Sequence, residues 1–415
     1  MAKTSITASP PRSIGAGRIS TWLLGLVCLG LLAFLLLQLV IQLLTPPPVS
    51  RLQLLRDVPL PGILVAQSGQ TLRQSVHFDR FDFQALDPQT GLLFTAHDGP
   101  SASNFPLIMG ELPAGSVLNP SIVVFDARQN KYVASINNVN VRGITVAPDI
   151  HKVYAADAGS SVIRVIDEQA CQVVINAGQF VCTVAKSIKA SQTPDSIEYD
   201  ADHHEVFVSE SGKLKPPKGV VDVISTQTDT VIKTINLGTT VGHIRYDAAA
   251  QRAFVVVVPA TGNSGVLAID PFTNTVIAHA TLPSACTIAH GLAIDESQQV
   301  AFVACVDSRN LAIVDVQTMK PIGDLNNLLG IKADIVVLDR SLHILFVGCQ
   351  NAISVFDESR AASGVLHKFG DYIVSSNSSH SIAVDNSTHN IYIPLTDVGS
   401  RPVMRVEHYN QHGTN

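Results

Sequence analysis

The chain has 415 residues, of which 46% are hydrophobic and only 15% are charged. Soluble domains average about 25% charged residues, and disordered chains are richer still in charge, so this composition excludes a disordered protein. Lys and Arg total 28 against 34 Asp and Glu, a net charge of −6. That balance argues against a nucleic-acid partner, because binding to the phosphate backbone needs an excess of positive charge.

The first predicted element is an uncharged apolar segment, Trp22–Leu44. A helix of this length spans about 35 Å, enough to cross a bilayer core. The segment continues into Thr45-Pro46-Pro47-Pro48 without a small-residue cleavage site, which favours an uncleaved anchor over a cleaved signal peptide. We therefore expect a cytoplasmic tail at 1–21, a transmembrane helix at 22–44 and a Pro-rich linker at 45–57.

Flanking charge predicts the orientation of this segment. Residues 1–20 hold Lys3, Arg12 and Arg18 and no acidic residue, whereas Arg51 and Arg56 on the other side are accompanied by Asp57. The positive-inside rule then places the N-terminus in the cytoplasm and the rest outside the cell membrane. Without those first three positive charges, 25 basic residues face 34 acidic ones, so the remaining domain has a net charge of −9.

The rest of the chain repeats one pattern seven times. An Asp recurs in six of the seven copies, and an aromatic residue follows seven positions after that column in all of them. The Asp column is occupied by Asp87, Ala147 (the exception), Asp200, Asp247, Asp295, Asp339 and Asp385. The aromatic column is Phe94, Tyr154, Phe207, Phe254, Phe302, Phe346 and Tyr392. Repeats of 40–50 residues indicate a solenoid or a propeller.

Each copy reads as four antiparallel strands. The Asp and aromatic columns bracket a predicted hairpin, a third strand follows as in GVLAID from Gly265, and a fourth as in NTVIAHATL from Asn274. Seven such units predict an all-β fold, a seven-bladed β-propeller over residues 58–415. The last copy, from Ser379, has room for three strands, so we expect part of Val58–Val76 to supply its outer strand and close the ring.

Two strand-turn-strand units, VDVISTQTDTVIKTINLG at 221–238 and VLAIDPFTNTVIAHATLP at 266–283, resemble those of the YVTN-repeat (YncE-like) family of seven-bladed propellers. The segments RFDFQALDP (80–88), AHGLAID…AFVAC (289–305) and HSIAVD…IYIPL (380–395) are similar to extracytoplasmic members. The resemblance covers residues 75–405 and implies a binding or scaffold protein. It says little about activity, because propellers also host lactonases and lyases.

The position five residues before the Asp column is predicted to form a ring around one mouth of the central channel. It is ionisable in six of seven copies, and the fourth copy has Gly there with a histidine beside it. This predicted ligand-binding set is Asp82, Arg142, Asp195, His243, His290, Asp334 and His380. In a chain with so little charge, the set is the strongest candidate for a functional site.

Two interpretations of this set remain open. In the first, a divalent cation such as Ca²⁺, Mn²⁺ or Zn²⁺, or a polar ligand, binds at the channel axis, because carboxylates and imidazoles suit such cations. Arg142 then pairs with an acidic neighbour or fixes a ligand carboxylate or phosphate. The candidate metal ligands are Asp82, Asp195, His290, Asp334 and His380. In the second, these side chains only bind backbone groups and ordered water.

The cysteines fit an oxidising compartment. Cys171 and Cys182 bracket an insert in the second copy, and Cys286 and Cys305 flank one hairpin, so both pairs are disulfide candidates. Cys349 is left over, either as a free thiol or as a partner for Cys305.

We therefore expect a membrane-anchored extracytoplasmic binding module that uses the channel-mouth face and takes a small molecule or a protein as its partner. The alternative is a metal-assisted hydrolase or lyase, lactonase-like, at the same ring; the chain has no nucleophile-elbow sequence. The insert Gly99–Pro120 carries the apolar run Phe105–Met109, which either covers the pocket, contacts a partner or packs on the propeller.

Overall fold

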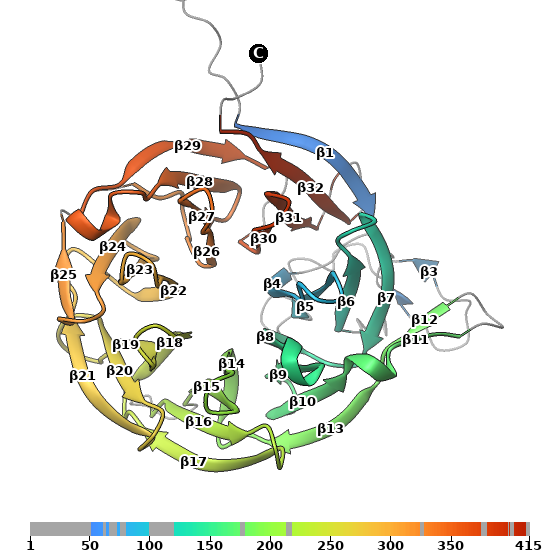
Figure 1. Cartoon of the computed structure of the whole chain (residues 1–415), viewed down its shortest axis with the longest axis horizontal. Coiled ribbons are helices and arrows are strands. Elements are labelled where there is room, and N and C mark those ends of the chain that lie inside the picture. The colour runs from blue at the N-terminus through green and yellow to red at the C-terminus, as the bar shows by residue number, and fades with distance from the viewer. Residues whose placement is uncertain are drawn as a thin grey trace, which may run out of the picture. The chain divides into compact units, whose positions relative to one another are not determined.

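The described part of the chain forms seven four-stranded antiparallel sheets arranged in a ring around a central channel (Figure 1). The computed structural model describes residues 51–60, 64–65, 73–74, 80–98, 120–174, 179–212, 218–323, 328–374, 380–396, 398 and 402–411. The prediction of an all-β, seven-bladed propeller is confirmed.

Each blade is a meander whose first strand lines the channel and whose fourth lies on the outside (Figure 1). Blades 1 to 3 are β4 (Arg80–Leu86), β5 (Leu92–Asp98), β6 (Ser121–Asp126), β7 (Lys131–Asn137); β8 (Val141–Ala147), β9 (Lys152–Asp157), β10 (Val162–Asp167), β13 (Val184–Lys189); and β14 (Thr193–Asp200), β15 (Glu205–Ser211), β16 (Val220–Ser225), β17 (Thr230–Asn236). Blades 4 and 5 are β18 (Thr240–Asp247), β19 (Arg252–Val258), β20 (Gly265–Asp270), β21 (Thr275–Thr281); and β22 (Ala289–Asp295), β23 (Val300–Cys305), β24 (Asn310–Asp315), β25 (Lys320–Ile322). Blades 6 and 7 are β26 (Val336–Asp339), β27 (Ile344–Gly348), β28 (Ala352–Asp357), β29 (His367–Ile373); and β30 (Ala383–Asp385), β31 (Asn390–Leu395), β32 (Val403–Tyr409), β1 (Leu52–Pro59).

Helical structure in the described residues consists of three short 3₁₀ turns, Pro148–Ile150, Glu168–Ala170 and Ala361–Ser363. Within that part of the chain, no helix has the length and apolarity needed to cross a bilayer. The predicted tail, transmembrane helix and start of the linker, 1–50, lie outside the described residues, as does the Phe105–Met109 run.

The Asp column has a structural role in the inner hairpins. The Asp87 carboxylate accepts hydrogen bonds from the backbone N–H of Gln89 at 2.7 Å and the Thr90 hydroxyl at 2.9 Å, which closes an Asx turn. Where the second blade has Ala147, the 3₁₀ turn Pro148–Ile150 makes the connection instead. Four positions after the column, every hairpin has a residue in the left-handed region. These residues are Gly91, His151, His204, Gln251, Gln299, His343 and His389.

The aromatic column forms the core between blades. All seven of its residues are fully buried, and each packs among aliphatic side chains of a neighbouring sheet. Because both faces of most sheets are covered in this way, the second and third strands are almost continuously apolar. This is why the domain is rich in Val, Ile and Ala and poor in charge.

The outer strand of the last blade comes from the N-terminal side of the domain. β1 pairs antiparallel with β32, from Leu52 opposite Tyr409 to Pro59 opposite Val403. Arg405 donates two hydrogen bonds of 2.8 Å to the Asp57 carboxylate across this pair. The strand therefore begins inside the stretch predicted as linker, and only its last two residues fall within the predicted Val58–Val76. Further along that stretch, β2 (Leu64–Val65) and β3 (Arg73–Gln74) form a small separate hairpin.

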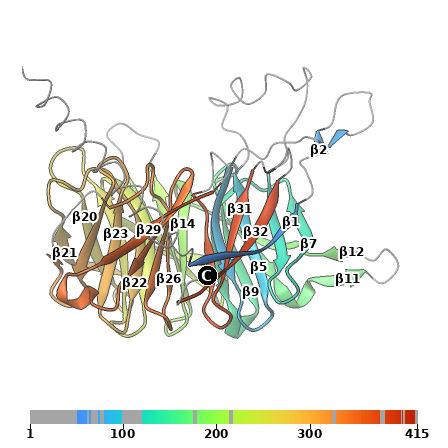
Figure 2. The ribbon, with the colours of Figure 1, turned by 90° about the horizontal axis from the view of Figure 1, so that it is seen from above.

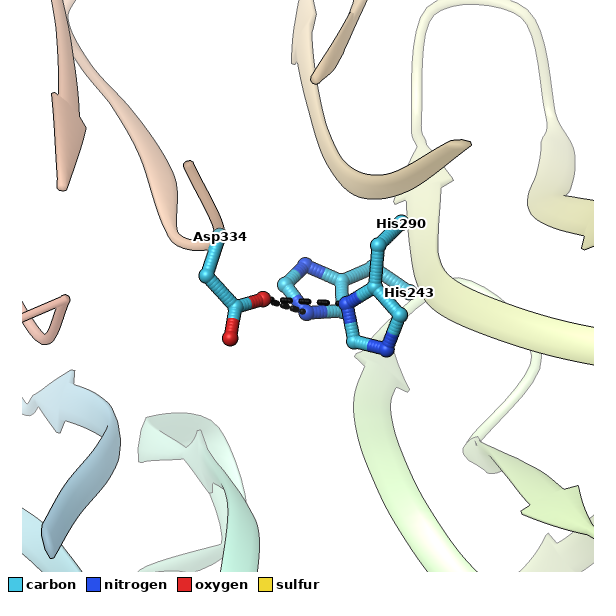
Figure 3. A group of neighbouring side chains, drawn as sticks. All are labelled: His243, His290 and Asp334. Carbon is cyan, nitrogen blue, oxygen red and sulfur yellow. Dashed lines mark hydrogen bonds and ion pairs between the residues drawn. The ribbon is translucent and has the colours of Figure 1, made fainter. Parts of the chain in front are cut away.

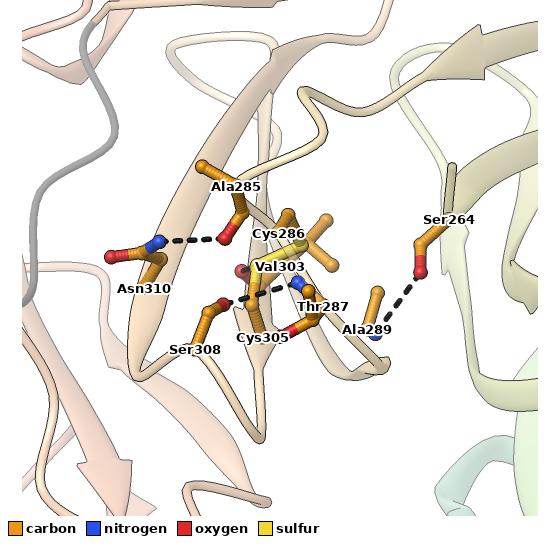
Figure 4. Close-up of a disulfide and its surroundings, with 9 residues drawn as sticks. All are labelled: Ser264, Ala285, Cys286, Thr287, Ala289, Val303, Cys305, Ser308 and Asn310. Atoms are coloured by element: carbon orange, nitrogen blue, oxygen red, sulfur yellow. Dashed lines mark hydrogen bonds between the residues drawn. A yellow bond between two sulfur atoms is a disulfide. The ribbon is translucent and has the colours of Figure 1, made fainter. Parts of the chain in front are cut away.

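Both predicted disulfides are confirmed. Cys171–Cys182 closes the hairpin of β11 (Gln172–Val174) and β12 (Gln179–Val181), which projects from the side of the ring (Figure 2). Cys286–Cys305 ties the segment before β22 to the end of β23 (Figure 4). Cys349 is buried and free, so the alternative pairing of Cys305 with Cys349 is wrong.

Candidate functional site

The predicted ring residues lie at the beginning of the inner strands. Asp82, Arg142 and Asp195 sit at the third position of β4, second of β8 and third of β14, and His290 is the second residue of β22. Asp334 and His380 come just before β26 and β30. Since all inner strands run in the same direction along the channel, these side chains gather at one mouth.

Small residues bring neighbouring blades together at this mouth. A side chain at Gly143 would collide with the carbonyl oxygen of Asp195, and one at Gly291 with the carbonyl oxygen of Asp334. At Gly242, a Cβ would come within 2.8 Å of the carbonyl oxygen of His290. The glycine of one blade therefore lets the ring residue of the next approach closely.

Asp334 is the centre of the cluster (Figure 3). Its Oδ1 lies 2.9 Å from Nδ1 of His290 and 3.3 Å from Nε2 of His243. Its Oδ2 lies 3.9 Å from Nε2 of His380. One carboxylate thus faces histidines from three other blades.

The cluster continues to the three remaining blades. Nε2 of His290 is 3.9 Å from Oδ2 of Asp195, and Nη1 of Arg142 is 3.4 Å from Oδ1 of the same carboxylate. Asp82 is buried, with 3% of its surface exposed, and its negative charge acts on His290. The structure therefore brings the predicted ring residues together; what they bind stays a prediction.

The electrostatics of the cluster follow from burial and opposite charges. Burial alone lowers the pKa of His290, but Asp334, Asp195 and Asp82 more than offset it, and the pKa rises to about 9. For Asp334, burial raises the pKa, and the surrounding imidazoles reverse that effect and hold it well below its usual value. At neutral pH the pair is therefore an imidazolium and a carboxylate.

His243 is the most enclosed member of the cluster. Its side chain is 1% exposed, and its ring lies 4.5 Å from that of Phe83 and 4.7 Å from that of His290. Burial lowers the pKa of His243 to about 4, so the ring is neutral at physiological pH. Among the described residues, its Nδ1 has no hydrogen-bond partner.

Three of these side chains have the geometry of a metal site. One ligand atom each from His243, His290 and Asp334 lies within 4.8 Å of the others. A site with two imidazoles and one carboxylate matches the ligands of catalytic zinc centres, which leave a fourth position open. The predicted metal set lacked His243 because its column position is held by Gly242. Of the other predicted ligands, Asp195 and His380 each come within 3.9 Å of one member, His290 and Asp334 respectively, but the three-residue group does not include them or Asp82.

A second group, Asp295, His343 and Glu358, lies between blades 5 and 6 at the hairpin-turn ends. Nδ1 of His343 is 3.1 Å from Glu358 and 4.0 Å from Asp295. The amide of Gln298 donates to both carboxylates, and burial together with Asp295 raises the pKa of Glu358 to about 7. The carboxylates already bind protein donors, so this group connects two blades.

Polar residues at the ends of the second strands stay within their own blades. Arg164 binds Asp157 at 2.8 Å on the sheet of blade 2. Burial and the neighbouring Asp222 raise the pKa of Glu210 to about 9 in blade 3. Neither Asp157 nor Glu210 belongs to the channel-mouth cluster.

Sequence reasoning missed a second polar pair inside the channel, Arg245 and Glu198. They occupy the position two residues before the Asp column in adjacent copies, where most other copies have Ala or Val. The unusual charge in that column is the signal that could have found them. Arg245 lies 5.1 Å over the ring of Phe83, which also contacts His243.

Comparison with known proteins identifies the fold class. No protein-family model matches the chain, and no curated protein matches it in sequence. Among solved structures, a chain of Kuenenia stuttgartiensis hydrazine synthase superposes with a TM-score of 0.57 at 16% identity, covering 82% of this chain and 99% of that one. At this identity the likeness shows the fold alone. The chain is a seven-bladed β-propeller, a fold consistent with an interaction module, and its membership of the YVTN-repeat family stays a prediction.

Proposed function

We propose that this protein is a membrane-anchored, extracytoplasmic propeller of the YVTN-repeat kind that binds a ligand through the channel-mouth cluster. The observation that carries the proposal is the convergence of His290, His243 and His380 on the single carboxylate of Asp334. Ionisable groups that are withdrawn from water, as His243 is and the others partly are, are costly, and their concentration at a channel mouth is typical of binding sites.

A divalent cation fits the centre of this cluster best. The cluster holds three carboxylates, those of Asp82, Asp195 and Asp334, against the guanidinium of Arg142 and the imidazolium of His290, so the negative charges outnumber these two positive ones and favour a cation. Two imidazole nitrogens beside a carboxylate oxygen favour Zn²⁺ or Mn²⁺ over Ca²⁺, which prefers oxygen ligands.

Equilibrium dialysis of the purified full chain against Zn²⁺, Mn²⁺ and Ca²⁺, followed by metal analysis, tests this proposal. We expect one Zn²⁺ or Mn²⁺ per chain, lost in the double variant His290→Ala/Asp334→Ala. The matched control is His389→Ala/Asp339→Ala, which removes a His–Asp pair of 2.8 Å at the hairpin-turn ends. Absence of metal from the unmodified chain, or equal loss in both variants, would refute the metal site.

The second candidate function is that of a metal-assisted hydrolase or lyase with its active site at the channel-mouth cluster. The observation that favours it is the three-ligand group His243, His290 and Asp334, because a three-ligand site leaves a position for an activated water. The metal-loaded chain is assayed with a panel of aliphatic lactones. Metal-dependent turnover that Asp334→Asn abolishes supports an enzyme, and metal binding without turnover supports the binding module.

The anchor is proposed from the uncharged segment Trp22–Leu44 and the positive charge before it. Alkaline carbonate extraction of membranes and protease treatment of intact cells test it. We expect the chain to stay in the membrane pellet and the propeller to be accessible from outside. Release by carbonate, or protection of the propeller, would contradict the proposal.

A further inference from the structure

Behind the channel-mouth cluster, the central channel contains a cavity of about 410 Å³. Inner-strand residues of several blades line it, and its polar side chains include Arg245, Glu198 and Gln84. The volume is within the range of small-molecule sites. Phe83 lines the cavity and also contacts His243, so the cavity lies next to the cluster without sharing its ligand residues.

Arg245 is positioned as an anion-binding group in this cavity. Its side chain is 18% exposed and its guanidinium lies over the Phe83 ring. Its Nη1 donates to the carbonyl of Ile244 at 2.7 Å and to the Ser196 hydroxyl at 3.5 Å, and the contact with Glu198 is a long 3.4 Å through the same nitrogen. Within the described residues, Nε and Nη2 make no hydrogen bond, which leaves two parallel donors of the kind that bind a carboxylate.

The walls of the cavity add further hydrogen-bonding groups. In the described part of the chain, each inner strand pairs with one neighbour, the second strand of its own blade. The free edges of β4, β8, β14, β18, β22, β26 and β30 therefore direct backbone N–H and C=O groups to the channel. A ligand with hydroxyl groups beside its carboxylate would be matched by these edges.

We propose that this cavity is a second binding site, which takes a small organic acid whose carboxylate binds the free edge of Arg245. The site is distinct from the channel-mouth cluster, because His290 and Asp334 contribute nothing to its lining. Hydroxylated acids bind more tightly than acetate, since acetate uses the guanidinium alone.

Isothermal titration calorimetry of the purified full chain with acetate, citrate and gluconate tests the proposal, with glucose as the neutral control. Arg245→Lys keeps the charge and removes the two parallel donors, so we expect its affinity for the acids to fall at least about tenfold. The matched control Arg164→Lys changes an ion-paired arginine of blade 2 outside the cavity and should leave the affinity unchanged. His290→Ala/Asp334→Ala should also retain acid binding, which separates this site from the proposed metal site.

A measurement on the unmodified chain keeps the proposal testable if Arg245→Lys does not fold. Phenylglyoxal modifies accessible arginines, and mass spectrometry of peptides gives the rate at each position. A bound acid should slow modification of Arg245 and leave that of Arg164 unchanged. No binding by any of the three acids at millimolar concentration, equal binding to Arg245→Lys, or binding of inorganic phosphate alone would each overturn the proposal.

Discussion

The disulfide between Cys286 and Cys305 allows a sharp prediction about both stability and the site. It closes a loop with a sequence separation of 19 residues, which restricts the unfolded chain by about 3 kcal/mol in the loop-entropy treatment. Both cysteines are buried, at 2% and 0% exposure, in the core between blades 4 and 5. We expect Cys286→Ala/Cys305→Ala to lower the unfolding free energy by about 3 kcal/mol and Tm by about 3–6 °C.

The same variant should weaken the channel-mouth site, because the segment that the disulfide tethers (Figure 4) continues along the chain into β22, whose second residue is His290. Denaturant titration measures the unfolding free energy of the variant, and equilibrium dialysis measures how much metal it still binds. Cys171→Ala/Cys182→Ala is the control: it removes a disulfide of similar loop size, with a separation of 11, at the projecting hairpin. It should lower stability and leave metal binding unchanged.

Peptide mapping checks the disulfide directly. No Lys or Arg lies between Cys286 and Cys305, whereas Glu296 does, so cleavage after Glu296 gives two peptides joined only by this bond. A linkage of Cys305 to Cys349, or a Cys286→Ala/Cys305→Ala variant as stable as the unmodified chain, would refute the reasoning.

Three further predictions concern stability. Asp57→Asn removes the negative charge opposite Arg405 and replaces one of the two acceptor oxygens that join β1 to β32 with an NH2 donor, so the unfolding free energy should fall by about 1–2 kcal/mol. Exposed Arg56→Gln on the same strand should change it by less than about 0.5 kcal/mol. Burial of Glu168, and to a smaller extent the nearby negative charge of Asp87, raises the pKa of Glu168 to about 8, so the folded state favours its protonated form. The stabilisation that Glu168 contributes is therefore fully present below its unfolded pKa of about 4.5 and is lost as the pH rises from there toward 8. Glu168→Gln should remove this contribution from the pH dependence measured by denaturant titration, and an unchanged pH dependence would contradict it. Ile288 is a β-branched residue, 47% exposed, whose backbone lies in the left-handed region with a φ of 51°, a conformation that Asn adopts more easily. Ile288→Asn should therefore raise the unfolding free energy by about 1 kcal/mol. A lower unfolding free energy would show that the backbone of Ile288 is not strained.

The sequence predicted the blades well because each hairpin carries its own local chemistry. The Asp column closes an Asx turn, the fourth residue after it adopts the left-handed conformation, and the aromatic column fills the space between sheets. These are contacts within a copy or with the next copy, so a repeat alignment contains them. The start of β1 was harder to predict, because Leu52–Asp57 pairs with β32 at the other end of the chain. Most of its residues are exposed and show little alternation of apolar and polar side chains.

The site was predictable in part for the same reason. A ring position common to all copies could be read from the alignment, and its members do meet at the channel mouth. Gly242 occupies the ring position in β18 and His243 stands beside it; the register irregularity between Val241 and Ile244 recurs at the same place in β4, β8 and β22, so it does not set β18 apart. The alignment placed His243 in the predicted ring only as the neighbour of Gly242, and it could not show that His243 groups more tightly with His290 and Asp334 than the other predicted metal ligands do.

The packing of Arg245 over Phe83 could not be predicted from the sequence, for a different reason. These residues come from blades 1 and 4, and their contact depends on how far opposite blades project into the channel. The periodic pattern specifies neighbouring blades and contains no distance across the ring.

X-ray absorption spectroscopy at the zinc edge of the Zn²⁺-loaded full chain tests directly whether the channel-mouth cluster binds a metal ion. We expect one bound Zn²⁺ with two histidine nitrogens and a carboxylate oxygen as protein ligands, at about 2.0–2.2 Å, and loss of the histidine signal in His243→Ala/His290→Ala. A spectrum without histidine scattering, or one that this variant leaves unchanged, would contradict the assignment of the channel-mouth cluster as the binding site.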